Sequence, residues 1–210
     1  MAENTDHIRE TIRFFTEKLA KHGTTAKGID FNSIEAMHTR YEQVLRAIKV
    51  RHGFSLNDFG CGFGAIIDYM QDHGFSDFDY TGYDVTDTMI DAARMRHADP
   101  QHRFVVGDHD AMTPADYTLA QGVFNMKLAT PVAEWADHVR RCLTAMYAVS
   151  GVAMSANFLT SYSDADLMRD DLYYPDPGEM FAFAKTLSRN VALLHDYDLY
   201  DFTLIIVRVA

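Results

Sequence analysis

A glycine-rich turn between an apolar run and a helical segment limits the possible folds more than any other feature of this chain. Residues 58–64 read DFGCGFG, directly after the strand-like run Phe54–Phe59 and before an apolar segment that starts at Ala65. Glycines at such a bend let the backbone turn sharply and approach a ligand closely. The order strand, glycine turn, helix predicts the first unit of an α/β sheet that binds its ligand at the carboxyl ends of the strands.

The rest of the chain follows this pattern until its last strands. Helical spacing or strand-like composition predicts alternating elements: helices over 6–21, from 32 to 48, and over 65–71, 88–96 and 135–147, with strands over 54–59, 80–83, 104–106, 117–120 and 152–157. Alternation of this kind favours a parallel sheet with helices on both faces. The strand-like runs 191–194 and 202–209 are separated by too few residues for a helical crossover, so we expect them to pair antiparallel.

Two acidic residues follow the next two strands. Asp84 closes the strand after the glycine turn, where a carboxylate can accept both hydroxyls of a ribose, and Asp108 closes the third strand, where it can meet the exocyclic amine of adenine. Each acid alone has an ordinary structural explanation, Asp84 as a helix N-cap and Asp108 as a turn residue. Their order relative to the glycine turn is what predicts a nucleotide-binding site.

Two kinds of cofactor fit this pattern. Gly60, Gly62 and Ala65 also satisfy a loose dinucleotide fingerprint, which leaves an NAD(P)-dependent reductase as an alternative. Asp58 stands where dinucleotide-binding folds usually hold an apolar residue, Gly64 is an additional glycine, and the terminal hairpin leaves no room for a separate substrate domain. These features argue against a nicotinamide cofactor.

With these motifs, residues 34–209 resemble the class I S-adenosylmethionine-dependent methyltransferases. The matching segments are 58–64, Tyr83-Asp84-Val85, 107–110 and 115–124. The resemblance implies a Rossmann-like doubly wound α/β fold, in which a mostly parallel seven-stranded sheet ends in an antiparallel hairpin. It also implies S-adenosyl-L-methionine as cofactor and S-adenosyl-L-homocysteine as product. The histidine often found a few residues beyond the fourth strand is missing, and Asn125-Met126-Lys127 stands there instead.

The resemblance also implies roles for individual residues. The backbone from Gly60 to Gly62 would lie against the methionine moiety, Asp84 would hold the ribose, Val85 and Met89 would flank the adenine, and Asp108 with the His109 backbone would meet its polar edge. The Gln121 carbonyl would accept from the methionine ammonium. For the methionine carboxylate we expect Arg40, because a guanidinium grips a carboxylate in a fork; a solvated helix residue is the alternative. The expected cofactor-binding residues are therefore Arg40, Asp58, Gly60, Cys61, Gly62, Asp84, Val85, Met89, Asp108, His109 and Gln121.

The acceptor is expected above the fourth and fifth strands, under a polar and aromatic insert near 158–180. Its expected contacts are Asn125, Arg169, Tyr173 and Tyr174, with packing as the alternative for the tyrosines. Asp164 and Asp176 suit N-caps of helices that follow them. His109 and His195, each at a predicted strand end, are the best-placed histidines for a general base, but neither is assigned that role. No metal site is expected.

Composition limits the partners. Thirty acidic against nineteen basic residues give a formal charge of −11, and the basic residues form no large cluster, which disfavours nucleic acid. The polar N-terminus, the absence of a long apolar run and the two isolated cysteines favour a cytoplasmic protein without a membrane span. We expect a helical cover over 1–53, a methyltransferase domain over 54–210, a small-molecule acceptor, and a monomer or homodimer. A non-catalytic S-adenosylmethionine-binding protein is the other alternative.

Overall fold

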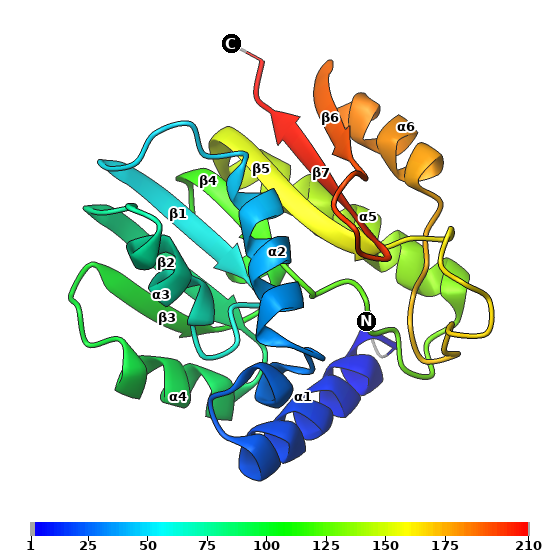
Figure 1. Cartoon of the computed structure of the whole chain (residues 1–210), viewed down its shortest axis with the longest axis horizontal. Coiled ribbons are helices and arrows are strands. Elements are labelled where there is room, and N and C mark those ends of the chain that lie inside the picture. The colour runs from blue at the N-terminus through cyan, green and yellow to red at the C-terminus, as the bar shows by residue number, and fades with distance from the viewer. Residues whose placement is uncertain (1–2, 210) are drawn as a thin grey trace.

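A mixed seven-stranded sheet forms the centre of the computed structural model, which describes residues 3–209 and the side chains of residues 7–209 (Figure 1). The strand order is β3-β2-β1-β4-β5-β7-β6. Strand β7 runs in the direction opposite to the other six strands of this sheet, so it pairs antiparallel with both β5 and β6. The predicted parallel sheet with a terminal hairpin is therefore confirmed. Met1, Ala2 and Ala210, which the expected segments include, lie outside the described residues. The strands are β1 (Phe54–Phe59), β2 (Phe78–Asp84), β3 (His102–Val106), β4 (Ala115–Ala120), β5 (Ser150–Leu159), β6 (Asn190–Leu194) and β7 (Asp201–Val207).

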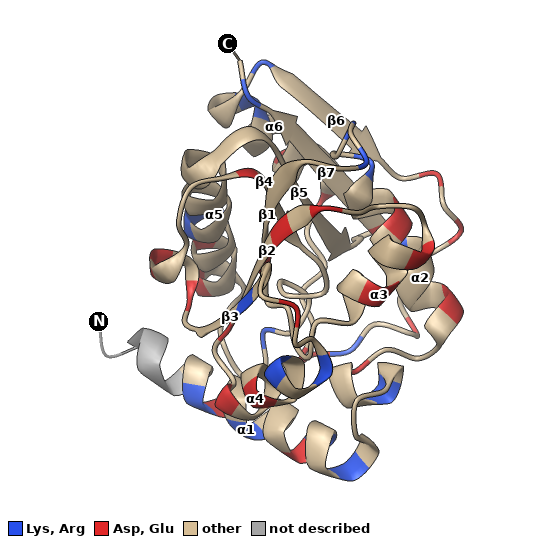
Figure 2. Cartoon of the chain, turned by 90° about the vertical axis from the view of Figure 1, so that its left-hand side faces the viewer, with Lys and Arg blue, Asp and Glu red and all other residues tan. Residues whose placement is uncertain are grey.

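Helices cover both faces of the sheet. In the edge-on view of Figure 2, α2 (Ile34–Leu45) and α3 (Ala65–Asp72) lie on one face and α5 (Val132–Val149) on the other, where α6 (Pro177–Leu187) also packs. Each layer has its own apolar core, with Tyr41, Val44 and Ile67 on the first face and Trp135, Leu143 and Phe158 on the second. Both faces are covered, so the central strands are buried along almost their whole length, including polar residues such as Asn57, Asp58 and Thr118.

The cover over the carboxyl edge of the sheet is α1 (Glu3–His22) rather than α2. Helix α1 lies across this edge and packs on α4 (Asp87–Arg96), where Phe15 and Leu19 contact Met89 (Figure 1). Helix α2, which falls within the cover expected over 1–53, buries its apolar face against the sheet, and Tyr41 is its one residue that lines the cavity described below. The cover is therefore formed by the first twenty or so residues, and α2 is part of the sheet's own helical layer.

The connection between α1 and α2 depends on glycine. Gly23 ends α1 with a φ of 63°, in the left-handed region that L-residues avoid. The short 3₁₀ helix η1 (Ala26–Ile29) follows, and a Cβ on Gly28 would lie 2.0 Å from the Gly23 carbonyl oxygen. The chain can therefore fold back tightly here, which places Ile29 and Phe31 beside the glycine turn of β1.

Helix caps follow the sequence signals in part. Ser33 caps α2 by accepting from the Ala36 N–H, and Asp176 caps α6 by accepting from the Glu179 N–H, as expected. The helix expected after Asp164 does not form, because that carboxylate is engaged by the Tyr200 hydroxyl and residues 161–171 make successive turns. A second 3₁₀ helix, η2 (His109–Ala111), follows β3.

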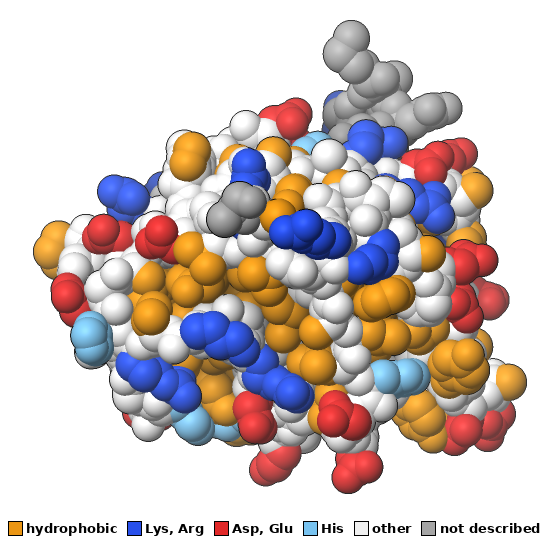
Figure 3. Space-filling model, turned by 90° about the horizontal axis from the view of Figure 1, so that it is seen from above, with side chains coloured by type: hydrophobic (Ala, Val, Ile, Leu, Met, Phe, Trp, Pro, Cys, Tyr) orange, Lys and Arg blue, Asp and Glu red, His pale blue; other side chains and the backbone are white. Residues whose placement is uncertain are grey.

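The face opposite α1 carries the amino ends of the parallel strands. Seen from this side, apolar side chains gather in patches between lysines and arginines, and the acidic side chains lie mainly at the margins (Figure 3). Among the described helices, none is both long and apolar enough to span a bilayer.

Candidate functional site

The glycine turn after β1 adopts a backbone that only glycine accommodates readily. Gly60, Gly62 and Gly64 have φ values of 76°, 53° and 77°. A Cβ on Gly60 would lie 2.3 Å from Cγ2 of Val123, so the turn and the segment after β4 approach each other too closely for any side chain. The N–H groups of Gly60 and Cys61 both donate to the Tyr83 carbonyl, at 2.7 and 3.0 Å, which fixes the turn against the end of β2.

Asp84 ties the end of β2 to this turn. Its Oδ2 accepts from the Gly62 N–H at 3.0 Å and its Oδ1 accepts from the Thr86 N–H at 2.8 Å. Burial raises the pKa of Asp84, and the two backbone hydrogen bonds oppose that shift. Each carboxylate oxygen can accept more than one hydrogen bond, so both remain available to hydroxyl groups of a ligand.

Asp58 lies under the turn as a buried carboxyl. The Tyr80 hydroxyl donates to its Oδ2 at 2.6 Å. Burial raises the pKa of Asp58 to about 7, since the hydrogen bond from Tyr80 only partly offsets the loss of water and the nearby Asp84 charge raises it further. Cys61, which is also buried, has its thiol pKa raised by burial and by both acids, so it stays a thiol rather than a nucleophilic thiolate.

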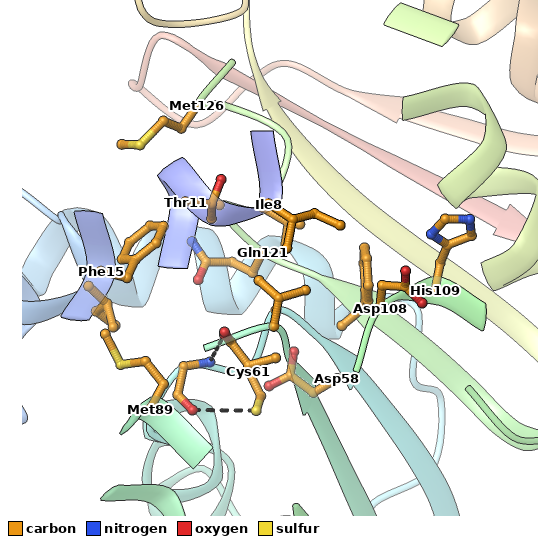
Figure 4. Close-up of a pocket in the computed structure, with 18 of the residues that line it drawn as sticks. Ile8, Thr11, Phe15, Asp58, Cys61, Met89, Asp108, His109, Gln121 and Met126 are labelled. Carbon is orange, nitrogen blue, oxygen red and sulfur yellow. Dashed lines mark hydrogen bonds between the residues drawn. The ribbon is translucent and has the colours of Figure 1, made fainter. Parts of the chain in front are cut away.

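A cavity of about 150 Å³ opens over these residues at the carboxyl ends of the parallel strands (Figure 4). Ten of the eleven residues expected to bind a cofactor line it, and they come from β1, β2, β3, β4 and the segments that follow them. The ten are Asp58, Gly60, Cys61, Gly62, Asp84, Val85, Met89, Asp108, His109 and Gln121. The fold thus gathers at one edge the residues that the motifs and the family resemblance indicated, and their contact with a cofactor stays a prediction.

Arg40 is the exception. Its Nε and Nη2 both donate to Asp201 Oδ2, at 3.1 and 2.6 Å, and it does not line the cavity. The Asp201 side chain is fully buried, so it needs this cation. Asp201 Oδ1 accepts in turn from Asn157, whose Oδ1 accepts from the Gly122 N–H. The prediction that Arg40 holds a ligand carboxylate is thus replaced by a structural role: it anchors a polar network under the end of β4.

The four residues expected to contact an acceptor also lie outside the cavity lining. Asn125 accepts from the Leu159 N–H through its side chain, and Tyr173 is buried in the core behind β5. Arg169 forms an exposed bidentate pair with Asp171, and the Tyr174 hydroxyl accepts from the Arg169 N–H. The polar and aromatic insert satisfies its own hydrogen bonds and packs on the segment after β4, which explains its composition without an acceptor.

The residues that roof the cavity were not foreseen as site residues. They are His7, Ile8, Thr11 and Phe15 of α1, Met126 after β4, and Trp135 and His138 of α5. The apolar spacing of α1 was visible in the sequence and predicted a helix, but not the surface that this face would cover. No sequence pattern indicates the contact between His7 and Trp135, whose ring centroids lie 4.3 Å apart although 128 positions separate them.

The roof is electrostatically neutral. Burial lowers the pKa of His7, and it lowers the pKa of His138 to about 4, helped by the neighbouring His109 and His7. Both imidazoles are therefore uncharged near neutral pH. Among the residues lining the cavity in the described part of the chain, no lysine or arginine is present, and the acids are Asp58, Asp84 and Asp108.

Comparisons with known proteins agree with this site. A family model described as "Methyltransferase domain" matches residues 57–150, which span the glycine turn and both following acids. The Mycobacterium tuberculosis (strain ATCC 25618 / H37Rv) protein named "Putative methyltransferase Rv1506c" is 43% identical over 167 residues, which are 79% of this chain and 100% of that protein. The fold and the site thus define a class I methyltransferase. The chain belongs to the methyltransferase family, and its resemblance to the S-adenosylmethionine-dependent members is confirmed.

Solved structures share the fold at low sequence identity. The magnesium protoporphyrin IX methyltransferase of Synechocystis PCC 6803, solved with bound S-adenosylmethionine, matches with a TM-score of 0.60 at 14% identity and covers 83% of this chain and 81% of its own. Human N-acetylserotonin methyltransferase, also solved with that cofactor, matches with a TM-score of 0.61 at 14% identity, over 99% of this chain and 68% of its own. The second match includes the N-terminal helices as well as the sheet.

Proposed function

We propose that this protein binds S-adenosylmethionine in the cavity at the carboxyl edge of the sheet and transfers its methyl group to a small-molecule acceptor. The observation that carries the proposal is the hydrogen bond from the Gly62 N–H to Asp84. It joins the glycine turn to the carboxylate that would hold the ribose, and both line one cavity. The cofactor supplies an electrophilic methyl group on a sulfonium. The chain's own part is to bind, to orient and to exclude water.

The residues present fit this cofactor. Gly60 and Gly62 have no Cβ and leave their backbone open to the methionine moiety, and Asp84 keeps free lone pairs for the ribose hydroxyls. Val85 and the fully buried Met89 offer apolar surface to the adenine. Asp108 and the His109 backbone would meet the polar edge of that ring, and the Gln121 carbonyl would accept from the methionine ammonium.

The cover over the cavity supports a small-molecule acceptor. Helix α1 lies over part of the cavity, and its residues His7, Thr11 and Phe15 line it directly. A polymer substrate would need an open groove along this edge, whereas a small molecule can be bound under a cover. Two structural neighbours carry names of small-molecule methyltransferases, for magnesium protoporphyrin IX and for N-acetylserotonin.

A labelling experiment tests the acceptor class directly. The purified protein is incubated with S-adenosylmethionine carrying a radioactive methyl group and with a cell extract divided by ultrafiltration into small molecules and macromolecules. We expect label in products of the small-molecule fraction, with formation of S-adenosylhomocysteine. Label confined to protein or nucleic acid would contradict the proposed acceptor class. Binding of the cofactor without transfer to either fraction would favour a non-catalytic S-adenosylmethionine-binding protein.

A further inference from the structure

Some residues that line the cavity have no proposed contact with the cofactor. The floor comprises the glycine turn, Asp84, Val85, Met89 and Asp108, all assigned above to cofactor binding. The roof residues have no cofactor role, and Figure 4 shows Ile8, Thr11 and Phe15 of α1 above the floor with Met126 beyond them. Because an acceptor must meet the methyl group from the side that the cofactor leaves free, the roof is where it would lie. This inference rests on the proposed function.

Two of the described lining residues carry a buried side-chain nitrogen without a hydrogen-bond partner, His109 at Nδ1 and Gln121 at Nε2, and Gln121 is the one beside α1. It is 9% exposed, and its Nε2 is buried with no hydrogen-bond acceptor among the described residues. Figure 4 places its amide between the glycine turn and α1, on the side of Phe15 and Thr11. A buried N–H without an acceptor is costly, so the fold holds ready a donor that a ligand oxygen would satisfy.

The charges around the cavity exclude one class of ligand. An anionic acceptor would enter a cavity whose lining holds three carboxyl groups and no lysine or arginine. The two roof imidazoles, His7 and His138, are neutral because burial lowers their pKa values. A carboxylate or phosphate on the acceptor would therefore meet three carboxyl groups and no lysine or arginine among the described lining residues, which is unfavourable.

The roof surface is aromatic and apolar. The Trp135 ring lies between His7 and His138, with centroids 4.3 and 4.8 Å away. The indole N–H is already used, since it donates to the Phe124 carbonyl at 2.9 Å. Trp135 thus contributes ring surface rather than a hydrogen bond, and Met126 adds a polarisable thioether beside it. Such surfaces favour flat rings in stacked or edge contact.

We propose that the roof is the acceptor site and that it takes an uncharged aromatic molecule whose oxygen accepts a hydrogen bond from the Gln121 side chain. His7, Trp135 and Met126 would contact the ring. Gln121 would favour a ring that carries an oxygen. The lining has no lysine or arginine among the described residues, which would disfavour a ring that carries an acidic group.

Trp135 makes the site directly observable, because it is the single tryptophan of the chain. Three probes of similar size are titrated in the presence of saturating S-adenosylhomocysteine: neutral 4-methylphenol, anionic 4-methylbenzoate and cationic 4-methylbenzylamine. Trp135 fluorescence and ligand-observed NMR report binding. We expect 4-methylphenol to bind at least about tenfold more tightly than 4-methylbenzoate, because the carboxylate would be buried beside three carboxyl groups. We also expect it to bind more tightly than 4-methylbenzylamine, because an ammonium has no lone pair to accept from the Gln121 side chain.

Substitutions then test the role of Gln121. We expect Gln121→Leu, and Gln121→Met if the first folds poorly, to weaken 4-methylphenol binding by about three- to tenfold, the range for one hydrogen bond. Affinity for S-adenosylhomocysteine should fall by a smaller factor than affinity for 4-methylphenol, because the cofactor contact proposed for this residue is made by its backbone carbonyl. The matched control is Gln43→Leu: Gln43 is also buried, but it bonds Arg46 and lies outside the cavity. This control should change neither affinity.

Three results would overturn the inference. The first is equal or tighter binding of 4-methylbenzoate, and the second is unchanged 4-methylphenol binding by both Gln121 variants. The third is a loss of S-adenosylhomocysteine affinity in those variants that matches the loss for the probe, because the amide would then serve the cofactor. Failure of the wild-type protein to bind S-adenosylhomocysteine at all would refute the proposed function itself, and is seen before any probe is added.

Discussion

Replacing Asp84 by alanine tests the cofactor site at its most constrained point. Its two carboxylate oxygens each accept one backbone N–H, from Gly62 and Thr86. Removing the carboxylate deletes the charged hydrogen bonds proposed for the ribose, worth about 1.5–3 kcal/mol. Affinity for S-adenosylhomocysteine should therefore fall by roughly 10- to 150-fold. The two N–H groups also lose their acceptors, so we expect the free energy of unfolding to decrease by about 1–3 kcal/mol.

The assay must separate these two effects. Thermal unfolding identifies a temperature at which the Asp84→Ala protein is fully folded, and calorimetric titration at that temperature gives the affinity. Asp91→Ala is the matched control, because Asp91 is an exposed acid on α4 paired only with Arg94; its affinity should stay within about twofold of wild type. A folded Asp84→Ala protein with wild-type affinity would refute the reasoning that this carboxylate holds the ribose.

Further substitutions address the buried charges and the glycine turn. Burial raises the pKa of Asp58 to about 7, so between about pH 4 and pH 7 the native state holds a proton that the unfolded state has released. The free energy of unfolding should therefore fall by up to roughly 4 kcal/mol as the pH rises through this range. Asp58→Asn should flatten that slope, which urea unfolding across the same range measures. Arg40→Met should lower the free energy of unfolding by about 3–5 kcal/mol, because it leaves Asp201 buried without a cation. Affinity for S-adenosylhomocysteine should change less than about fivefold in calorimetry, and a larger loss would show that Arg40 binds the cofactor. Gly60→Ala should cost about 1–3 kcal/mol of stability in thermal unfolding, because its Cβ would overlap Val123, and should weaken binding of S-adenosylhomocysteine at least about tenfold; wild-type values of both would show that the turn is not constrained.

The sequence predicted the sheet and the floor of the cavity because both depend on local order along the chain. A strand followed by a glycine turn, and acids at the ends of the next strands, define positions that a parallel sheet must bring to one edge. Asp84 and Asp108 line the same cavity for that reason alone. The expected hairpin of β6 and β7 was equally local, since the short connection permits only an antiparallel pair.

The roof could not be predicted, because it depends on contacts between distant segments. Helix α1 has an apolar face that the sequence shows, but whether this face covers the sheet edge depends on the fold-back at Gly23 and Gly28. Arg40 was misassigned for a related reason. Arg40 pairs with Asp201, which is 161 positions away in the sequence yet adjacent in the fold. A partner at that distance along the chain could not be identified from the sequence.

The insert after β5 shows the limit of composition as a guide. Its tyrosines, acids and arginine suggested a substrate lid, but in the structure these groups bond one another or pack in the core. Tyr173 is 6% exposed, and Arg169 is paired with Asp171. Polar and aromatic residues in a long loop serve the loop's own order as readily as a ligand.

Calorimetric titration of the purified protein with S-adenosylmethionine, S-adenosylhomocysteine, NADH and NADPH shows directly which cofactor the cavity binds. We expect the two adenosyl-sulfur compounds to bind with dissociation constants on the order of micromolar, or about −8 kcal/mol, and neither nicotinamide compound to bind. Binding of NADH or NADPH with no response to the other two would contradict it, because the glycine turn and Asp84 would then serve a dinucleotide.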